Sequence, residues 1–314
     1  GHTGWASFDL FVRRLPANRN FLVVAGIQQA LDYLTNLRFS GREIEYLRQQ
    51  PALQHISEAF FEYLRGFQFS GNVYAMEEGS IAFPHESIMQ VHAPLIEAQL
   101  IETFLISTVQ FQTMVASKAA RVVQAAQADG EERNVLEFGS RRAHGGEAGA
   151  LAGRAAFVGG CKATSNTLAG YQFGVPVSGT MAHSWIMAFE EEKAAFEAFY
   201  QHFKEQSVFL VDTYDAVEGT RLAAALDQPF RGVRLDSGDL DSLSRQARAI
   251  LDQHGHRQAQ VLASGDLNEY RIRELVQAEA PIDAFGVGTQ LSTSADAPYL
   301  PMVYKLTAYE QGGA

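Results

Sequence analysis

From Val135 onward the sequence repeats one unit, a short apolar run followed by a polar loop and a helical pattern. Strands that alternate with helices predict a parallel sheet with right-handed crossovers. The expected strands are Val135–Phe138, Val175–Ser178, Val208–Asp212, Gly232–Leu235, Gln260–Ala263 and Ala284–Val287. Helices are expected over Ser184–Phe203, Leu240–Gln253 and Asn268–Ala278. Six such units fit either an α/β barrel or a doubly wound sheet.

The residues before this repeat mix short strands with helices. The pattern predicts strands over Phe8–Val12, Val73–Met76 and Ile81–Phe83, and helices over Gly26–Leu34, Ser57–Leu64 and Leu95–Ala126. The last segment, Met302–Tyr309, again reads as an isolated strand. We expect it to return and pair with the first part of the chain.

Polar residues follow the expected strands at the point where each strand ends. They are Glu137, Ser178-Gly179-Thr180, Asp212-Thr213-Tyr214-Asp215, Asp236-Ser237-Gly238-Asp239, Ser264-Gly265-Asp266 and Gly286-Val287-Gly288-Thr289. Each segment alone fits a turn or a helix N-cap. In barrels, however, active sites form at the carboxyl ends of the strands. Together the segments indicate a rim suited to a polyphosphate sugar with Mg²⁺, because carboxylates suit Mg²⁺ and glycine loops hold phosphate.

The last of these strand ends, Gly286–Thr289, fits either a tight turn or a phosphate site. The loops after the final strands of a barrel are a common place for phosphate.

Several charged and titratable side chains are concentrated at the first strand end. Residues 135–145 read Val-Leu-Glu-Phe-Gly-Ser-Arg-Arg-Ala-His-Gly, so an acid, two arginines and a histidine share one edge of the sheet. Arginine presents a planar fork of donors to anionic oxygens, which suits a ligand with several phosphates. A solvated turn is the alternative reading of an isolated Arg141-Arg142 pair.

Two histidines compete for a chemical role. His183 follows a strand end and starts a helix, so its ring can face the rim as a proton carrier or a phosphate-accepting nucleophile. His144 is the rival because it lies in the arginine loop. The remaining candidates are expected to be structural or on the surface: His85, His92, His254 and His256.

Composition excludes several classes of function. A net charge of −11 and a pI near 5.3 argue against nucleic-acid binding, which needs a basic face. Cys161 is the only cysteine, which excludes an intrachain disulfide and disfavours a cysteine-based zinc site. Because no uncharged apolar run approaches membrane-spanning length, a cytoplasmic protein without membrane contact is expected.

Several motifs, in order, resemble those of nicotinate phosphoribosyltransferases. They are Glu137-Phe-Gly-Ser-Arg-Arg-Ala-His-Gly145, Gly179-Thr-Met-Ala-His-Ser-Trp185, Asp212-Thr-Tyr-Asp215, Val233-Arg-Leu-Asp-Ser-Gly-Asp-Leu240, Phe285-Gly-Val-Gly-Thr289 and Tyr304-Lys305-Leu306. The resemblance covers nearly the whole chain, from about Phe8 to Leu306.

The resemblance implies an ATP-dependent enzyme of NAD salvage. Such an enzyme transfers the phosphoribosyl group of 5-phosphoribosyl-1-diphosphate to nicotinate, coupled to ATP hydrolysis and assisted by Mg²⁺. The implied fold is α/β: an irregular six-stranded parallel α/β barrel with an N-terminal α/β sandwich that the C-terminal strand completes. We place the boundaries at residues 1–130, 131–295 and 296–314. A homodimer with shared active sites is implied as well.

The resemblance also implies roles for individual residues. His183 matches the histidine that ATP phosphorylates, Arg234 and Thr180 match nicotinate contacts, and Thr289 matches a phosphate contact. Arg141 and Asp236 complete the implied catalytic set with His183, and Asp236 or Asp239 could hold metal-bound waters or ribose hydroxyls. The remaining implied substrate-binding residues are Ser140, Ser165, Gly265, Asp266 and Gly288. The metal ligands themselves stay open.

Two alternatives accompany this reading. A nicotinamide-specific relative has Arg-Pro-Asp-Ser-Gly-Asn where this chain has Arg234–Asp239, and an aspartate where this chain has Thr164-Ser165-Asn166. An extra carboxylate would repel nicotinate, so its absence favours the acid substrate. The other alternative is a non-catalytic phosphosugar- or nucleotide-binding barrel. Two departures from the family's sequence pattern favour this second alternative. No Thr-Asp-Leu-Tyr-Gln segment precedes Phe8, and only Thr307–Ala314 follows the last motif.

Overall fold

The computed structural model describes residues 4–310, and the chain divides into two compact units. One unit contains the residues up to Thr113 together with those from Tyr299 onward, and the other runs from Met114 to Pro298. Among the described residues, no helix is both long and apolar enough to cross a membrane.

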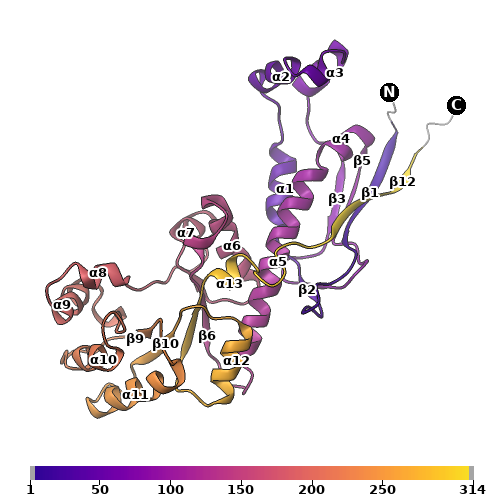
Figure 1. Cartoon of the computed structure of the whole chain (residues 1–314). Helices are drawn as coiled ribbons and strands as arrows, with labels where there is room; N and C mark the ends of the chain where they lie inside the picture. Colours follow the sequence, from indigo (N-terminus) through magenta and orange to yellow (C-terminus); the bar gives the residue numbers. More distant parts are fainter. Residues whose placement is uncertain (1–3, 311–314) are drawn as a thin grey trace. The chain divides into compact units, whose positions relative to one another are not determined.

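The first unit is built on a four-stranded antiparallel sheet (Figure 1). Its order is β12 (Met302–Tyr309), β1 (Trp5–Val12), β5 (Met89–Pro94) and β3 (Asn72–Ala75). The strand β1 alternates half-buried and buried residues, as expected for a strand with one face on a core. The return of Met302–Tyr309 is confirmed by its pairing with β1, where the Phe8 ring stacks on Tyr304 at 4.6 Å.

Helices and a small two-stranded sheet complete this unit. They are β2 (Leu22–Val23), α1 (Ile27–Asn36), α2 (Gly41–Arg48), the 3₁₀ turn η1 (Pro51–Leu53), α3 (Glu58–Arg65), β4 (Ile81–Ala82) and α4 (Leu95–Leu100). The long helix α5 (Glu102–Ala126) follows α4 after a break at Ile101, so the continuous helix expected from Leu95 is wrong at that residue.

The second unit holds a six-stranded parallel sheet that curls into a half-barrel (Figure 1). Its order is β7 (Ala163–Thr164), β6 (Asn134–Glu137), β11 (Ala284–Val287), β10 (Gln260–Ala263), β9 (Gly232–Leu235) and β8 (Val208–Leu210). Every residue of β11 is buried, as expected for a central parallel strand covered on both faces. Small and branched side chains of this sheet form a buried hydrophobic cluster: Leu136, Ala163, Leu262 and Ala284.

Helices and short 3₁₀ turns connect these strands. They are η2 (Ser140–Arg142), α6 (Gly146–Val158), α7 (Thr167–Phe173), α8 (His183–Met187), α9 (Glu192–Phe203), η3 (Lys204–Gln206), α10 (Ala216–Ala224), α11 (Leu240–Gln253), α12 (Glu269–Gln277) and α13 (Thr289–Ser292). The single helix expected over Ser184–Phe203 is wrong, since α8 ends at Met187 and α9 begins at Glu192.

One expected strand is also wrong. Val175–Ser178 is not a strand of the sheet, although Val177 forms one parallel bridge to Thr164. The sixth strand is instead β7, which is two residues long and too short to give a periodic pattern. In the described part of the chain, the edge strands β7 and β8 do not pair with each other. The sheet is therefore an open, curled variant of the expected barrel.

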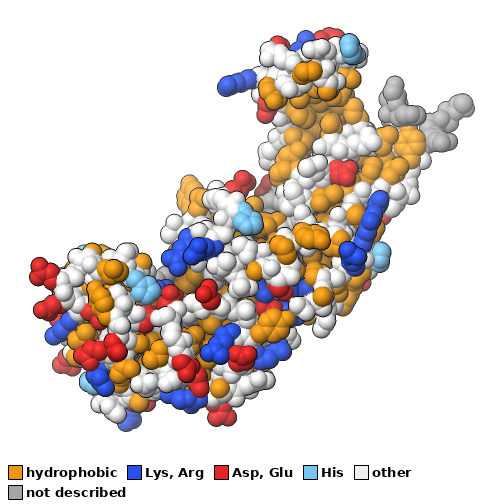
Figure 2. Space-filling model, in the orientation of Figure 1, with side chains coloured by type: hydrophobic (Ala, Val, Ile, Leu, Met, Phe, Trp, Pro, Cys, Tyr) orange, Lys and Arg blue, Asp and Glu red, His pale blue; other side chains and the backbone are white. Residues whose placement is uncertain are grey.

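The outer helices of this unit carry charged side chains of both signs (Figure 2). On α9, α10 and α11 they form pairs one turn apart, such as Lys193 with Glu197 and Arg245 with Asp241. Exposed pairs of this kind contribute little stability and keep the helix surfaces hydrated.

Candidate active site

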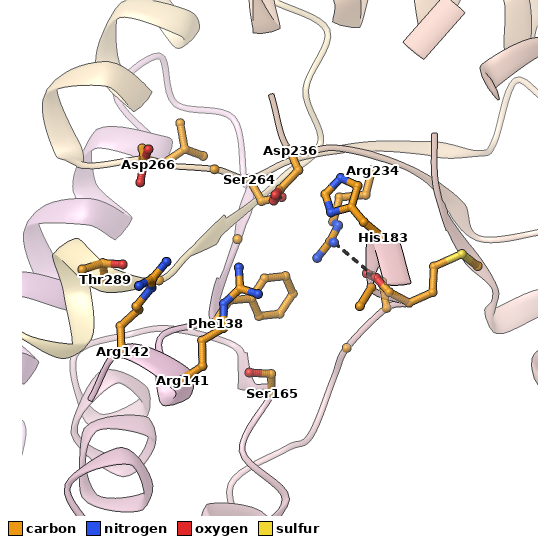
Figure 3. A pocket seen from close by; sticks show the side chains of 18 of the residues that line it. Phe138, Arg141, Arg142, Ser165, His183, Arg234, Asp236, Ser264, Asp266 and Thr289 are labelled. Carbon is orange, nitrogen blue, oxygen red and sulfur yellow. Dashed lines mark hydrogen bonds between the residues drawn. The ribbon is translucent and has the colours of Figure 1, made fainter. Parts of the chain in front are cut away.

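The carboxyl ends of β6, β9, β10 and β11 surround a cavity of about 710 Å³. Most of the residues singled out in the sequence line it, namely Arg141, Ser165, Thr180, His183, Arg234, Asp236, Gly265, Asp266, Gly288 and Thr289. Most of them follow the ends of different strands, whereas Thr180 and His183 come from the loop between α7 and α8 and from the start of α8. Figure 3 shows several of these side chains around the cavity. A volume of this size suits a ligand larger than a single ring.

Two of the singled-out residues lie outside this lining. The Ser140 hydroxyl accepts a hydrogen bond from the Asn166 side-chain amide at 3.0 Å and so joins η2 to the start of α7. Asp239 occupies the N-cap position of α11 without a capping bond from its own side chain. Asn166 itself caps α7 by accepting the Ala169 N–H, so this pairing fixes the arginine loop locally.

The Glu137 carboxyl group does not reach the rim, contrary to the expectation for the first strand end. It is fully buried, where Oε1 accepts the Gly139 N–H and Oε2 accepts the Thr164 hydroxyl at 2.6 Å. Burial raises its pKa, while these two hydrogen bonds oppose the rise. The carboxyl group therefore shapes the turn beneath the cavity, and that turn presents Arg141 and Arg142 to the cavity.

Phe138, which was not among the candidate residues predicted from the sequence, also lines the cavity. Phe138 is half-buried and lies between Arg141 and Arg234 in the view of Figure 3. A Cβ atom at Gly286 would come within 2.5 Å of the Phe138 ring, so only glycine leaves room for the ring in this place. The sequence signal that could have identified Phe138 is its position at the end of a predicted strand.

Arg234 brings a half-buried cation to the cavity wall. Its Nη2 donates to the Met181 carbonyl at 3.2 Å, drawn as the dashed line in Figure 3. Its Nε is buried and has no hydrogen-bond partner among the described residues. Burial lowers the pKa of the Arg234 guanidinium, and the nearby carboxylates of Asp236 and Asp212 oppose this effect. A buried donor without a partner is costly unless a ligand supplies an acceptor.

His183 is held by a carboxylate behind it. Its Nε2 lies 3.3 Å from Oδ1 of Asp212, whose side chain is 3% exposed, whereas His183 is 40% exposed. The other oxygen of Asp212 accepts the Asp236 N–H at 2.8 Å and the Ser237 hydroxyl at 2.6 Å. Asp212 therefore orients the imidazole and the strand end that carries Asp236. The sequence placed Asp212 at a strand end and in a motif, without a role of its own.

The loop after β10 approaches the strand end of β9 closely. A Cβ atom at Gly265 would lie 1.8 Å from the Asp236 carbonyl oxygen, and Gly265 has φ +86°. Asp266 follows with φ 44°, an uncommon conformation for a residue with a side chain. Both residues line the cavity. The backbone here is held in a conformation that places the Asp266 carboxyl group opposite the arginines (Figure 3).

Glu192, the first residue of α9, has a perturbed carboxyl group near Asp212. Burial raises its pKa to about 7, and the charges of Asp212, Asp215 and Glu218 add to the rise. Its Oε1 is buried without a hydrogen-bond partner in the described part of the chain. The folded protein thus keeps this proton up to about pH 7, whereas an unfolded chain releases it near the ordinary value of 4.5.

The Glu192→Gln variant is expected to be more stable than the wild type at pH 8. The folded state binds more protons between the two pKa values, so the free energy of unfolding of the wild type falls as pH rises through that window. After allowance for solvent screening, we expect a gain of about 1 kcal/mol at pH 8 and none at pH 4.5. Urea unfolding at both pH values measures it. Glu197→Gln on the same helix is the control, and an equal gain in both variants would contradict the account.

The cavity offers carboxylates but no preformed metal cluster. Among residues 4–310, no group of three or more His, Cys, Asp or Glu side chains is arranged to hold a metal ion. Mg²⁺ needs less, because it usually binds one or two carboxylates, waters and substrate phosphates. Asp236 and Asp266 both line the cavity, so this donor set fits a phosphate-bound Mg²⁺.

Comparison with protein families gives two consecutive matches. Residues 1–110 match the N-terminal domain of nicotinate phosphoribosyltransferase, and residues 134–312 match the nicotinate phosphoribosyltransferase family.

Relatives of known name agree with these matches. The chain is 46% identical over 317 residues to a nicotinate phosphoribosyltransferase of Mycobacterium tuberculosis, covering 99% of this chain and 67% of the relative. It is 46% identical over 319 residues to that of Bacillus subtilis, covering 99% and 64%. The chain thus spans about two thirds of the length of these relatives.

Solved structures show the same architecture. Human nicotinic acid phosphoribosyltransferase superposes with a TM-score of 0.84 at 28% identity, covering 98% of this chain and 71% of the human chain. Nicotinate-nucleotide pyrophosphorylase from Pyrococcus furiosus superposes with a TM-score of 0.79 at 26% identity, covering 98% and 70%.

Proposed function

The chain belongs to the nicotinate phosphoribosyltransferase family, and from this premise we propose that it joins nicotinate to the phosphoribosyl group of 5-phosphoribosyl-1-diphosphate. The products are nicotinate mononucleotide and diphosphate. The reaction belongs to NAD salvage.

The Arg234 guanidinium at the cavity wall is the observation that supports the proposal most directly. Its buried Nε has no partner among the described residues, and a carboxylate bound in the cavity would accept hydrogen bonds from the guanidinium. Nicotinate carries its carboxylate on a flat aromatic ring, and Phe138 offers a ring face beside Arg234 on which a pyridine could stack. In this arrangement the pyridine nitrogen points away from Arg234, toward the middle of the cavity.

The donor's phosphates suit the opposite part of the cavity. Arg142 lies beside Thr289 there, and Arg141 lies nearer the middle of the cavity, beside Phe138, in the view of Figure 3. Diphosphate leaves while positive charge develops on the ribose, so the arginines stabilise the leaving group. Asp236 and Asp266 would hold Mg²⁺, which neutralises phosphate oxygens when it is bound. Holding both substrates in line converts a bimolecular encounter into an intramolecular one.

ATP coupling is proposed to act through His183. The γ-phosphoryl group would pass to a ring nitrogen of His183 and ADP would leave, which places a dianionic group at the cavity wall beside Arg234 and Asp236. The Asp212 carboxylate orients the ring for this transfer. The family resemblance further supports a homodimer and a cytoplasmic location.

Specificity for the acid is proposed to depend on Ser165, which lines the cavity. The Ser165→Asp variant is expected to lose nicotinate turnover at least about tenfold and to gain measurable nicotinamide turnover. An added carboxylate repels nicotinate and accepts a hydrogen bond from a neutral amide. Ser165→Asn is the matched control, because it adds similar bulk without charge. The ratio of kcat/KM for the two bases measures the effect, and an unchanged ratio in the aspartate variant would remove Ser165 from the account.

The function is tested by incubating the protein with nicotinate, 5-phosphoribosyl-1-diphosphate, Mg²⁺ and ATP. Nicotinamide is supplied in a parallel reaction, and products are identified by chromatography and mass. We expect nicotinate mononucleotide and diphosphate in equal amounts. Binding of the donor without turnover would favour a non-catalytic phosphosugar-binding protein, and equal use of both bases would overturn the specificity for the acid.

A further inference from the structure

A buried lysine outside the cavity is bonded to two of the segments that form the cavity wall. Lys118 lies in α5, and its side chain is 1% exposed. Its Nζ lies 2.5 Å from Oε2 of Glu269 and 2.8 Å from Oδ1 of Asp296. All three residues belong to the unit that runs from Met114 to Pro298. One ammonium group therefore joins two carboxylates that are far apart in the sequence.

The first carboxylate fixes the loop after β10. Glu269 is the first residue of α12, and the cavity-lining residues Gly265–Leu267 come shortly before it. Asn268, which connects them, caps α12 by accepting the N–H groups of Tyr270 and Arg271. Because the cap is tight and Leu267 is 2% exposed, a shift of Glu269 would carry the loop with it.

The second carboxylate fixes the segment after β11. Asp296 follows α13, whose residues Thr289 and Gln290 line the cavity. Between them, the Ser292 hydroxyl donates to the Gly139 carbonyl, and the buried Ser294 hydroxyl donates to Ala297 at 3.0 Å. The position of Asp296 is thus coupled to Gly288–Gln290 by a short, bonded path.

The charges of this network balance. Arg121, one turn along α5 from Lys118, donates from Nε to Oε1 of Glu269 at 3.0 Å, so two cations meet two carboxylates. Burial favours a higher pKa for Glu269, but the bonds from Lys118 and Arg121 outweigh it and lower the pKa. Buried ion pairs often give no more stability than apolar side chains of similar volume. Such pairs nevertheless fix the relative positions of their groups, because separating them leaves an uncompensated buried charge.

We propose that Lys118 is a positioning residue, whose ammonium group holds the loops Gly265–Leu267 and Gly288–Gln290 at the spacing that the phosphates of the donor require. This inference rests on the proposed function, which assigns phosphates to that part of the cavity. Lys118 touches no substrate and acts through Glu269 and Asp296.

The Lys118→Met variant is expected to raise the KM for 5-phosphoribosyl-1-diphosphate on the order of tenfold, because small displacements of positioning groups have large effects. The KM for nicotinate is expected to stay within about twofold, since Arg234 and Phe138 lie on other strands. Calorimetric titration of inorganic diphosphate is expected to show the same loss of affinity as the donor. Lys118→Arg, which keeps the charge, is expected to recover most of that affinity.

Arg248→Met is the matched control. Arg248 is a partly buried cation on α11 that donates to the carbonyls of His256 and Ala259, before the start of β10 and away from the cavity. It is expected to lower stability without changing either KM. If Lys118→Met does not fold, Asp296→Asn removes one of the two contacts and is expected to weaken diphosphate binding alone.

Equal changes in both KM values, or unchanged diphosphate affinity, would overturn the positioning role. Absence of turnover in the wild type would overturn the proposed function instead, and the diphosphate titrations would still test the role of Lys118.

Discussion

The Arg234→Met variant is expected to raise the KM for nicotinate about 100-fold, because truncating one partner of a buried charged pair costs about 2–5 kcal/mol. Methionine keeps the length of the side chain and removes the donors, so the loss is one of charge and hydrogen bonding rather than of volume. The guanidinium lines the cavity, and its buried Nε has no partner in the described part of the chain, so a ligand carboxylate is its natural acceptor. Steady-state kinetics with each substrate varied separately measures the effect.

Arg142→Met provides the opposite control. Arg142 lies beside Thr289 on the far side of the cavity from Arg234 (Figure 3). Its loss is expected to raise the KM for 5-phosphoribosyl-1-diphosphate and to leave the KM for nicotinate within about twofold. If Arg234→Met raised both constants equally, or left the KM for nicotinate unchanged, Arg234 would not be the nicotinate contact.

The His183→Ala variant is expected to lose ATP hydrolysis and phosphate incorporation into the protein at least about 100-fold, because alanine offers no nucleophile. Some transfer without ATP is expected to remain, since Arg141, Phe138 and Arg234 are unchanged. Incorporation of radiolabelled phosphate from γ-labelled ATP, and its release by acid, measures the effect.

His144→Ala is the control for this assignment. His144 is an exposed residue that does not line the cavity, although it shares the arginine loop. It is expected to incorporate phosphate as the wild type does. If His144→Ala removed the acid-labile phosphate and His183→Ala kept it, the roles of the two histidines would have to be exchanged.

In the second unit, the four-residue strands between polar loops were predictable from the sequence, and the two-residue strand was not. The strands at Gly232–Leu235, Gln260–Ala263 and Ala284–Val287 have the expected bounds, because each is a largely buried, mostly apolar run between polar loops. The two-residue strand β7 gives no such run. The apolar residues of segment 175–178 predict a strand, but Val177 is exposed and forms only one bridge, to Thr164, because tertiary pairing cannot be read from a short apolar run.

The candidate site likewise has features that were predictable from the sequence and features that were not. Charged residues at strand ends, such as Arg141 and Arg234, could be assigned to one rim because parallel strands end at one edge. The direction of each side chain could not be read from the sequence. Glu137 turns into the interior to bond Thr164, and Phe138 enters the cavity only because Gly286 leaves room for it. The Lys118 network depends on contacts across about 150 residues or more of sequence, which no local pattern reveals.

The central claim is that this cavity recognises a pyridine carboxylate through Arg234. Calorimetric titration of the wild-type protein with nicotinate and, separately, with nicotinamide tests it most directly, because the two rings differ only in the group that would meet Arg234. We expect nicotinate to bind at least about tenfold more tightly, as a charge-assisted pair does relative to a neutral one. Equal affinity for the two, or tighter binding of nicotinamide, would contradict the claim.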